Sequence, residues 1–412
     1  MSKQTTIQQH QSTAKLSGKR LNSLDGLRGV AVLSVIAFHT LRVTGNEGLV
    51  GRAISRLQET AWAGVDLFFV LSGFLITGIL LDSRDSPNYF RTFFARRTLR
   101  IFPLYYGVLA LAIIVVPAIV GYGHLPDLYP RLVANQFWLW TYTANYLQAT
   151  GRHTLPGFGH FWSLAIEEQF YWFWPAVVYF VSGRRLFQIC VAVCLLSPVL
   201  RLFLIEFGGV REWAIRQYTF TRLDTLLAGA LVAVLLREPK LLAQFRRMII
   251  AAVGLSSVVL VVIAVRNHYL PYEATETVVL GYSCLAILFG AVVHHLAARQ
   301  GPLTQVLSSS LVRWFGRYSY GIYIFHWPIA QAYGAALEPK LAKAFGSQFY
   351  PAEFAFVVVA SVSAAVAFLS WHVFEVRFLR LKEYFTYSTP ERSQKPSMVQ
   401  DVPLPELTGV NS

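Results

Sequence analysis

Arg28 and His39 stand within the first apolar stretch of the sequence, residues 27–43. Arg28 and His39 are eleven residues apart, which is about three helical turns, so both would point from one face and lie about 16 Å apart along the axis. An ionisable group in a bilayer costs roughly 2.5 to 3.5 kcal/mol on insertion scales, so each requires a reason. Alternatively, Arg28 reaches the inner headgroups and His39 is a satisfied polar residue of the helix bundle.

A later apolar stretch carries two adjacent carboxylates, Glu167 and Glu168. On a helix they point about 100° apart, so at least one must face a polar interior. Ser163 and Tyr171 lie four residues before and after Glu167, which makes that face polar over two turns. The alternative is a structural ion pair with a buried arginine, for which the sequence offers Arg201 and Arg222.

Further polar side chains recur in other apolar stretches. Ser319, Tyr323 and His326 are spaced i, i+4, i+7 and so share a helix face. Ser72 does not lie in a G-x-S-x-G turn, and close helix packing is the expected use of a small residue there. We expect the following residues to support the site or to lie on its acceptor side: Asp66, Ser72, Ser163, Tyr171, Arg222, Asp224, Ser319, Tyr323 and His326.

Arginines cluster just before the apolar stretch 101–120. Guanidinium forks suit phosphate oxygens, so with Arg28 this cluster could hold a cytosolic phosphorylated donor. Positive-inside topology alone also predicts such a cluster. The candidate donor-binding residues are Arg28, Arg96, Arg97 and Arg100.

The candidate residues are polarised along the membrane normal. Those that could transfer protons collect toward the expected outer half: His39, Glu167, Glu168 and His326. The guanidinium groups collect on the inner side. This arrangement suits a reaction that joins a cytosolic donor to an acceptor across the membrane.

The composition is that of a membrane protein. Of 412 residues, 55% are hydrophobic and 14% charged, whereas soluble domains carry about 25% charged residues. The net charge of +14 is spread between apolar segments and forms no single patch, which argues against a nucleic-acid partner. The three cysteines lie in apolar runs without metal-ligand spacing, so we predict neither a disulfide framework nor a metal site.

The apolar pattern predicts an all-α polytopic transmembrane bundle of about ten spans. With the N-terminus inside, 23 of the 36 Lys and Arg residues fall on the inner side and ten on the outer, which predicts that both termini are cytoplasmic. Segment 133–148 is aromatic and polar, so we interpret it as interfacial or re-entrant. The predicted spans are 27–43, 62–81, 101–120, 161–181, 186–206, 219–236, 248–265, 277–298, 314–335 and 353–374.

Three regions follow from this pattern. Residues 1–23 form a polar cytoplasmic segment, 24–376 the membrane domain and 377–412 a cytoplasmic tail. The tail is expected to be disordered from about residue 386, because it is polar and proline-rich. The first apolar run lacks a cleavage site, so we expect it to be retained as an anchor.

Six motifs in order over residues 24–376 resemble the acyltransferase-3 family of integral membrane O-acyltransferases. Its signature, an Arg and a His separated by ten residues, is matched by Arg28 and His39. The motifs are Leu24-Asp25-Gly26-Leu27-Arg28-Gly29 with His39; Gly64 to Phe74, including Asp66 and Ser72; Arg96-Arg97 with Arg100 and Pro103; Trp162-Ser163 with Glu167-Glu168-Gln169 and Tyr171; Arg222 with Asp224 and Gly229; and Ser319-Tyr320 with Tyr323 and His326.

The resemblance implies transfer of an acyl group, usually acetyl from acetyl-CoA, to hydroxyls of cell-surface glycans or glycolipids such as lipopolysaccharide, exopolysaccharide or peptidoglycan. It implies a multi-pass protein of the bacterial inner membrane with acyl-CoA as donor substrate and no bound cofactor. Some relatives carry a C-terminal SGNH esterase-like domain, and we find no such domain in this sequence.

His39 is the first candidate for the general base, because a neutral imidazole can take the acceptor's proton near pH 7. Glu167 or Glu168 would orient it or relay the proton, and an acyl-His39 intermediate is a second route. A proton-coupled transporter, or a non-catalytic subunit of a polysaccharide assembly, is the alternative function. The acceptor, the acyl chain length and the oligomeric state are left open.

Overall fold

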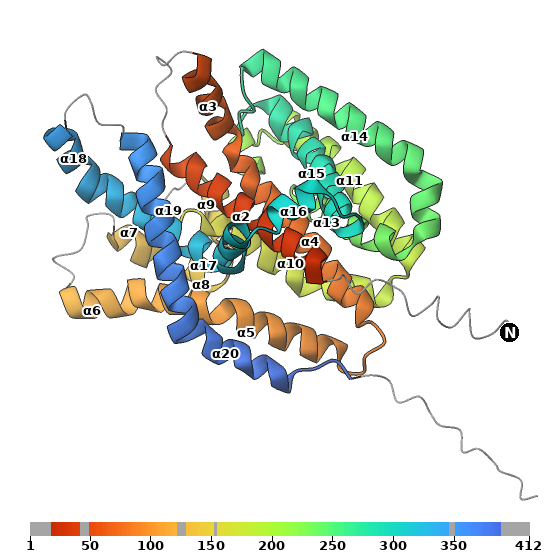
Figure 1. Cartoon of the computed structure of the whole chain (residues 1–412), viewed down its shortest axis with the longest axis horizontal. Helices are drawn as coiled ribbons and strands as arrows, with labels where there is room; N and C mark the ends of the chain where they lie inside the picture. The colour runs from red at the N-terminus through yellow and green to blue at the C-terminus, as the bar shows by residue number, and fades with distance from the viewer. Residues whose placement is uncertain (1–17, 42–48, 122–128, 152–154, 346–350, 389–412) are drawn as a thin grey trace, which may run out of the picture.

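The protein is a bundle of α-helices, shown as a computed structural model in Figure 1. The structure describes residues 18–41, 49–121, 129–151, 155–345 and 351–388, and within these ranges it contains no β-strand. The predicted all-helical class is therefore confirmed for the described chain.

Each predicted span coincides with a long helix of the described chain. These helices are α2 (Gly18–Thr40), α4 (Gly64–Asp82), α5 (Tyr89–Ala110), α10 (Phe161–Phe180), α11 (Gly183–Glu206), α13 (Leu223–Arg237), α14 (Pro239–Asn267), α15 (Tyr282–Ala298), α17 (Ser310–Ala332) and α19 (Pro351–Ser370). Shorter helices connect them: α3 (Leu49–Thr60), α6 (Val116–Val120), α7 (Tyr129–Ala134), α8 (Gln136–Trp140), α9 (Ala144–Ala149), α12 (Glu212–Ile215), α16 (Pro302–Leu307), α18 (Glu338–Phe345) and α20 (Val376–Arg380).

Six helical segments of the described chain are long and apolar enough to cross a membrane: Ser55–Asp82, Tyr89–Val120, Gly183–Glu206, Pro239–Asn267, Thr277–Ala298 and Phe354–Tyr384. The other four expected spans are helical but shorter or more polar. For example, α13 has 15 residues and α10 carries Glu167 and Glu168. The protein is thus a multi-pass membrane protein, and the number ten and the side of the termini stay predictions.

Burial explains why the polar helices tolerate a membrane. Figure 1 shows α2, α4, α10, α13 and α17 in the middle of the bundle, with α14 at its edge. Most residues of the apolar window in the Ser55–Asp82 segment are buried, whereas most of those in α11 and α14 are not. The outer helices therefore present leucine and valine toward lipid and shield the helices that carry charge.

Close approach of two central helices depends on glycine. A β-carbon on Gly73 of α4 would lie 1.8 Å from the Leu226 carbonyl oxygen, and one on Gly229 of α13 would lie 1.9 Å from that of Val70. The backbones therefore touch directly, as small residues allow within membranes. The packing role that the sequence suggested for Ser72 falls to its neighbour Gly73.

Two buried ion pairs connect α13 to its neighbours α4 and α11. Arg222 bonds to Asp66, joining α13 to α4, and its guanidinium carbon lies 3.9 Å from the Tyr282 ring centroid. Arg201 of α11 bonds to Asp224 at 3.0 Å. All four charged side chains are at most 2% exposed. Asp66 is therefore a buried ion-pair partner, and neither arginine pairs with Glu167 or Glu168 in the described chain.

Segment 133–148 forms no single spanning helix. It is divided among α7, α8 and α9, of five or six residues each, which at about 1.5 Å per residue is less than a third of the hydrocarbon thickness. Tyr105 and Tyr106 of α5 donate hydrogen bonds to the carbonyl oxygens of Leu139 and Trp140 at 2.8 and 3.1 Å. The segment thus packs against α5, in agreement with an interfacial or re-entrant placement.

The beginning of the C-terminal region packs against the chain before and within α5. Arg96 donates to the carbonyl oxygens of Lys382 and Phe385, at 3.2 and 2.8 Å. Asn88 donates to the Thr386 carbonyl oxygen at 2.8 Å. Chain packing therefore extends past residue 386, where we expected disorder to begin. The expectation of disorder for 389–412, like the N-terminal residues 1–17, lies outside the described residues.

Candidate active site

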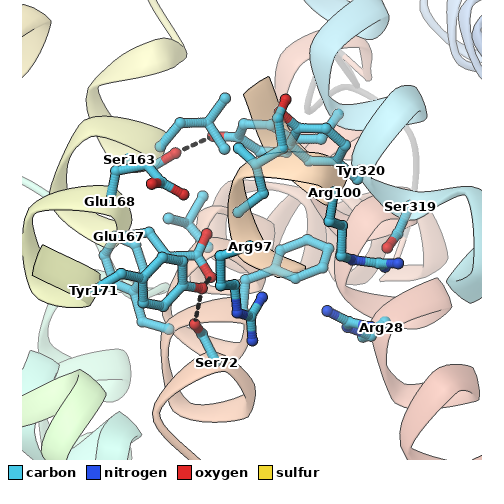
Figure 2. A pocket seen from close by; sticks show the side chains of 16 residues that line it. Arg28, Ser72, Arg97, Arg100, Ser163, Glu167, Glu168, Tyr171, Ser319 and Tyr320 are labelled. Carbon is cyan, nitrogen blue, oxygen red and sulfur yellow. Dashed lines mark hydrogen bonds between the residues drawn. The ribbon is translucent and has the colours of Figure 1, made fainter. Parts of the chain in front are cut away.

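A cavity of about 70 Å³ lies where α2, α4, α5, α10 and α17 meet. We call it the arginine cavity. Its walls are Arg28, Val65, Phe68, Phe69, Ser72, Arg97, Arg100, Ile101, Ser163, Leu164, Glu167, Glu168, Tyr171, Ser319, Tyr320 and Tyr323. Figure 2 shows the side chains of Arg28, Arg97 and Arg100 directed toward a common space.

The three arginines have few anionic partners. The Arg28 guanidinium lies 3.9 Å from the half-exposed Asp25 carboxylate, and the Arg97 guanidinium carbon lies 4.9 Å from the Tyr171 ring centroid. In the described chain no carboxylate lies within 4.0 Å of Arg97 or Arg100. Three adjacent positive groups repel one another, so an anion in the cavity would be stabilised by all three.

Carboxylates form the facing wall of the arginine cavity. The Tyr171 hydroxyl donates to Glu167 and also bonds to Ser72. Glu168, one residue on, is 5% exposed. The α10 face predicted from Ser163, Glu167 and Tyr171 therefore exists and turns toward the arginines.

A second cavity, of about 360 Å³, is lined in part by His39. We call it the histidine chamber. It is lined by Val35, Phe38, His39, Trp62, Val65, Gln148, Gly159, His160, Trp162, Trp213, Arg216, Gln217, Tyr272, Glu273, Tyr323 and Trp327. Aromatic rings and amides dominate these walls, in contrast to the guanidinium and carboxylate groups of the first cavity.

Three imidazoles lie together beside this chamber. The His39 ring is 5.4 Å from His326, and His326 is 5.0 Å from His160, between centroids. His326 Nδ1 lies 2.6 Å from the Tyr323 carbonyl oxygen, and His160 Nε2 lies 3.2 Å from that of Ile324. Because a carbonyl only accepts, these nitrogens carry the protons in the neutral rings. The other nitrogen of each ring is buried without a partner among the described residues.

The two cavities share the side chains of Val65 and Tyr323. The Tyr323 hydroxyl bonds to Ser163 and to the His160 carbonyl oxygen, the latter at 3.1 Å. Tyr323 therefore lies between the cavities, and its hydroxyl is held at the beginning of α10.

The structure brings most of the predicted site together. The arginine cavity is lined by Arg28, Ser72, Arg97, Arg100, Ser163, Glu167, Glu168, Tyr171, Ser319 and Tyr323. His39 lines the other cavity, with His326 buried next to it. Asp66, Arg222 and Asp224 form the ion pairs that join the helices.

Two placements differ from the sequence-based expectation. Glu167 and Glu168 line the arginine cavity and not the histidine chamber. Their face of α10 is directed toward α5, on the other side of Tyr323 from His39. Arg96 does not line the cavity at all, since it is exposed and bonds to the C-terminal region. Consecutive residues on a helix point about 100° apart, and here Arg97 faces the cavity while Arg96 faces the C-terminal region.

Sequence reasoning missed two residues of the chamber, His160 and Arg216. His160 directly precedes α10 and stands just before a predicted span, and Arg216 follows the short helix α12. Both lie outside the apolar stretches, where polar residues are ordinary. The aromatic residues near them in sequence were the available signal.

Metal ligation is not indicated in the described ranges, where no group of three or more His, Cys, Asp or Glu side chains is placed to hold an ion. The polarity of the two cavities instead suits an anionic and a hydroxyl-bearing ligand. Fold and cavities together define a multi-pass helical membrane protein with two adjoining cavities.

Comparison with known proteins gives the family. Residues 21–370 match the acyltransferase-3 family model, described as an acyltransferase domain, so the chain belongs to this family. It is similar to peptidoglycan O-acetyltransferase OatA of Listeria monocytogenes, with 29% identity over 77% of this chain and 50% of OatA. It is also similar to "Putative peptidoglycan O-acetyltransferase YrhL" of Bacillus subtilis, with 32% identity over 74% of this chain and 48% of YrhL.

The chain spans about half the length of these relatives. No solved structure matches it.

Proposed function

We propose that the protein transfers an acetyl group from acetyl-CoA to a hydroxyl of a cell-wall glycan. The observation that carries the proposal is the pair of adjoining cavities, one walled by Arg28, Arg97 and Arg100 and the other by His39. Family membership and the names of two relatives, which both specify peptidoglycan O-acetyltransferase, support acetyl transfer and a glycan acceptor.

The arginine cavity suits the donor. CoA carries three phosphate groups, and arginine binds phosphate oxygens through charge-assisted and often bidentate hydrogen bonds. Glu167 and Glu168 would offset the guanidinium charge when the cavity is empty. Their position with the arginines favours this role over orienting His39.

The histidine chamber suits the acceptor. His39 would remove the proton of the acceptor hydroxyl as its oxygen attacks the thioester carbonyl carbon, and the CoA thiolate would leave and take up a proton. In a two-step route, the His39 imidazole attacks the thioester carbonyl carbon and the CoA thiolate leaves; the acceptor hydroxyl oxygen then attacks the resulting N-acetylimidazole, and the released imidazole takes up the hydroxyl proton. His326, 5.4 Å away, is better placed than either glutamate to orient His39.

We infer further that the protein lies in the bacterial inner membrane with both termini in the cytoplasm. The excess of Lys and Arg in the segments expected inside, 23 against ten, supports this orientation. The donor arginines would then open toward cytosolic acetyl-CoA. A reporter fused after residue 385 checks the orientation and should report a cytoplasmic location.

Reconstitution tests the proposed activity. The purified protein is placed in liposomes, with labelled acetyl-CoA on the side of the C-terminus and peptidoglycan fragments on the other. We expect base-labile acetyl on the glycan and one CoA thiol released for each acetyl transferred. Transport of either compound without ester formation would instead identify a transporter.

A further inference from the structure

Arg216 lines the histidine chamber, and aromatic rings surround its guanidinium group. Its guanidinium carbon lies 4.8 Å from the ring centroids of both Trp162 and Tyr272 and 6.0 Å from that of Trp62. Within the described chain, no carboxylate lies within 4.0 Å of it. The buried Arg201 and Arg222, in contrast, each bond to an aspartate.

Aromatic rings hold a guanidinium differently from a carboxylate. Ring faces fix the plane of the group and attract its charge, but they accept few of its five N–H donors, which point along the edge of that plane. Arg216 is therefore positioned in advance and retains the capacity for a bidentate bond. The group that fits is a carboxylate or a phosphate.

Glu273 is the acidic side chain among the described walls of this chamber, and it does not come within 4.0 Å of the Arg216 guanidinium. Burial and the neighbouring Glu273 carboxylate raise the pKa of the Tyr272 phenol, against the opposing effect of Arg216. The Tyr272 hydroxyl therefore stays neutral near pH 7 and can donate to Glu273. Arg216 stays the cationic contact of the chamber.

The other walls of the chamber suit a sugar. Trp213, Tyr272 and Trp327 are partly exposed in it, and Gln148 and Gln217 add amide groups. The Gln217 side-chain oxygen is buried and has no partner within the described residues. Aromatic surfaces with a few placed polar groups are typical of small-molecule sites.

We infer that Arg216 binds an anionic group of the acceptor, so that the histidine chamber selects an acidic glycan. The hydroxyl to be acylated lies at His39, and a carboxylate or phosphate of the same acceptor pairs with Arg216. This inference rests on the proposed function, because it assumes that the acceptor occupies this chamber. It adds a specificity-determining residue and a class of acceptor.

The phosphates of the donor are a poorer match for Arg216. The donor has its own arginines in the other cavity, and Val65 and Tyr323 stand between the two sites. His39 and Arg216 line one chamber, so a ligand that reaches His39 is exposed to the Arg216 donors.

The test compares Arg216→Gln with wild type on three matched acceptors: a uronate-containing oligosaccharide, its carboxyl-reduced counterpart and a phosphorylated counterpart. Hydrogen bonds to charged groups contribute about 1.5 to 3 kcal/mol, which corresponds to roughly a tenfold to 150-fold change in affinity. We expect a loss of this size for an anionic acceptor, and no change for the neutral one or in the acetyl-CoA KM. Loss confined to the uronate identifies a sugar carboxylate, and loss confined to the phosphorylated acceptor identifies a phosphate.

Arg211→Gln is the matched control, since Arg211 is exposed five residues earlier and does not line the chamber. Equal losses for acidic and neutral acceptors in Arg216→Gln would overturn the inference, because they would mean that Arg216 only supports the rings. Binding of each oligosaccharide, followed by tryptophan fluorescence, is measured alongside transfer. Arg216-dependent anion binding without any acetyl transfer would retain the site and reject the proposed function. Acetyl transfer at the same rate to acidic and neutral acceptors would support the proposed function and reject the anion site at Arg216.

Discussion

The arginine cavity and the histidine chamber share Val65 and Tyr323 but differ in the side chains that dominate their walls. The first has three arginines facing two glutamates, and the second has imidazole, indole and amide groups around a single arginine. Charged walls suit a polyanionic nucleotide, and aromatic walls suit a sugar. Under the proposed function, this difference would keep the two substrates apart until they react, so variants on the two sides should have separable kinetic effects.

Among the variants that test this difference between the cavities, His39→Ala should have the largest effect on the rate of acetyl transfer. Loss of a general base lowers kcat by roughly 10²- to 10⁴-fold, while acetyl-CoA binding should stay unchanged because its arginines are in the other cavity. Acetyl transfer and acetyl-CoA affinity in purified protein are the measurements. His295→Ala, an exposed histidine on α15, is the control and should retain activity. A His39→Ala protein within a few-fold of wild-type kcat would remove His39 from the mechanism.

Asp66→Ala tests whether buried arginines divide into structural and substrate-binding groups. It leaves Arg222 charged, 1% exposed and without its partner, which costs about 3 to 5 kcal/mol. We expect a lower yield of folded protein and a lower Tm in detergent. In Asp82→Ala, the Arg237 pair is removed where the aspartate side chain is 56% exposed, and the loss should be about 1 kcal/mol or less. Equal losses in both variants would contradict the structural role of the buried pair.

Arg28→Lys, Arg97→Lys and Arg100→Lys sharpen the assignment of the donor side. Lysine retains the charge but not the fork, so loss of a bidentate phosphate contact should raise the acetyl-CoA KM by about tenfold. The KM for the acceptor should stay nearly constant, because the acceptor occupies the other chamber. We expect the effect for Arg28 and for at least one of the other two. Wild-type acetyl-CoA affinity in all three variants would place the donor site elsewhere.

The sequence predicted the positions of the long helices well, but it did not predict which buried charged side chains pair with one another. Apolar stretches located every long helix, because burial in a bilayer demands continuous apolar residues. Pairing was less accessible: Arg222 could balance several acids, and only the crossing of α4 and α13 at Gly73 and Gly229 brings it to Asp66.

The sequence also did not predict which cavity each face of a helix points to. Glu167 could be placed near the outer boundary, yet which cavity it faces depends on how α10 packs against α4 and α5. The resemblance to a known family indicated these residues as one set and did not divide them between two cavities. That division comes from Tyr323, whose hydroxyl bonds to Ser163 across the bundle.

Arg96→Ala is the smallest expected change and the most direct check on which face of α5 points to the arginine cavity. Arg96 adjoins Arg97 in sequence, but its guanidinium donates to the carbonyl oxygens of Lys382 and Phe385. Its removal should leave the acetyl-CoA KM within about twofold, while the loss of these bonds weakens docking of the C-terminal segment by about 1 to 3 kcal/mol. Limited trypsin digestion after Arg380 and Lys382 should then become faster in the variant than in wild type. A tenfold rise in the acetyl-CoA KM with unchanged proteolysis would mean that Arg96, and not Arg97, faces the donor.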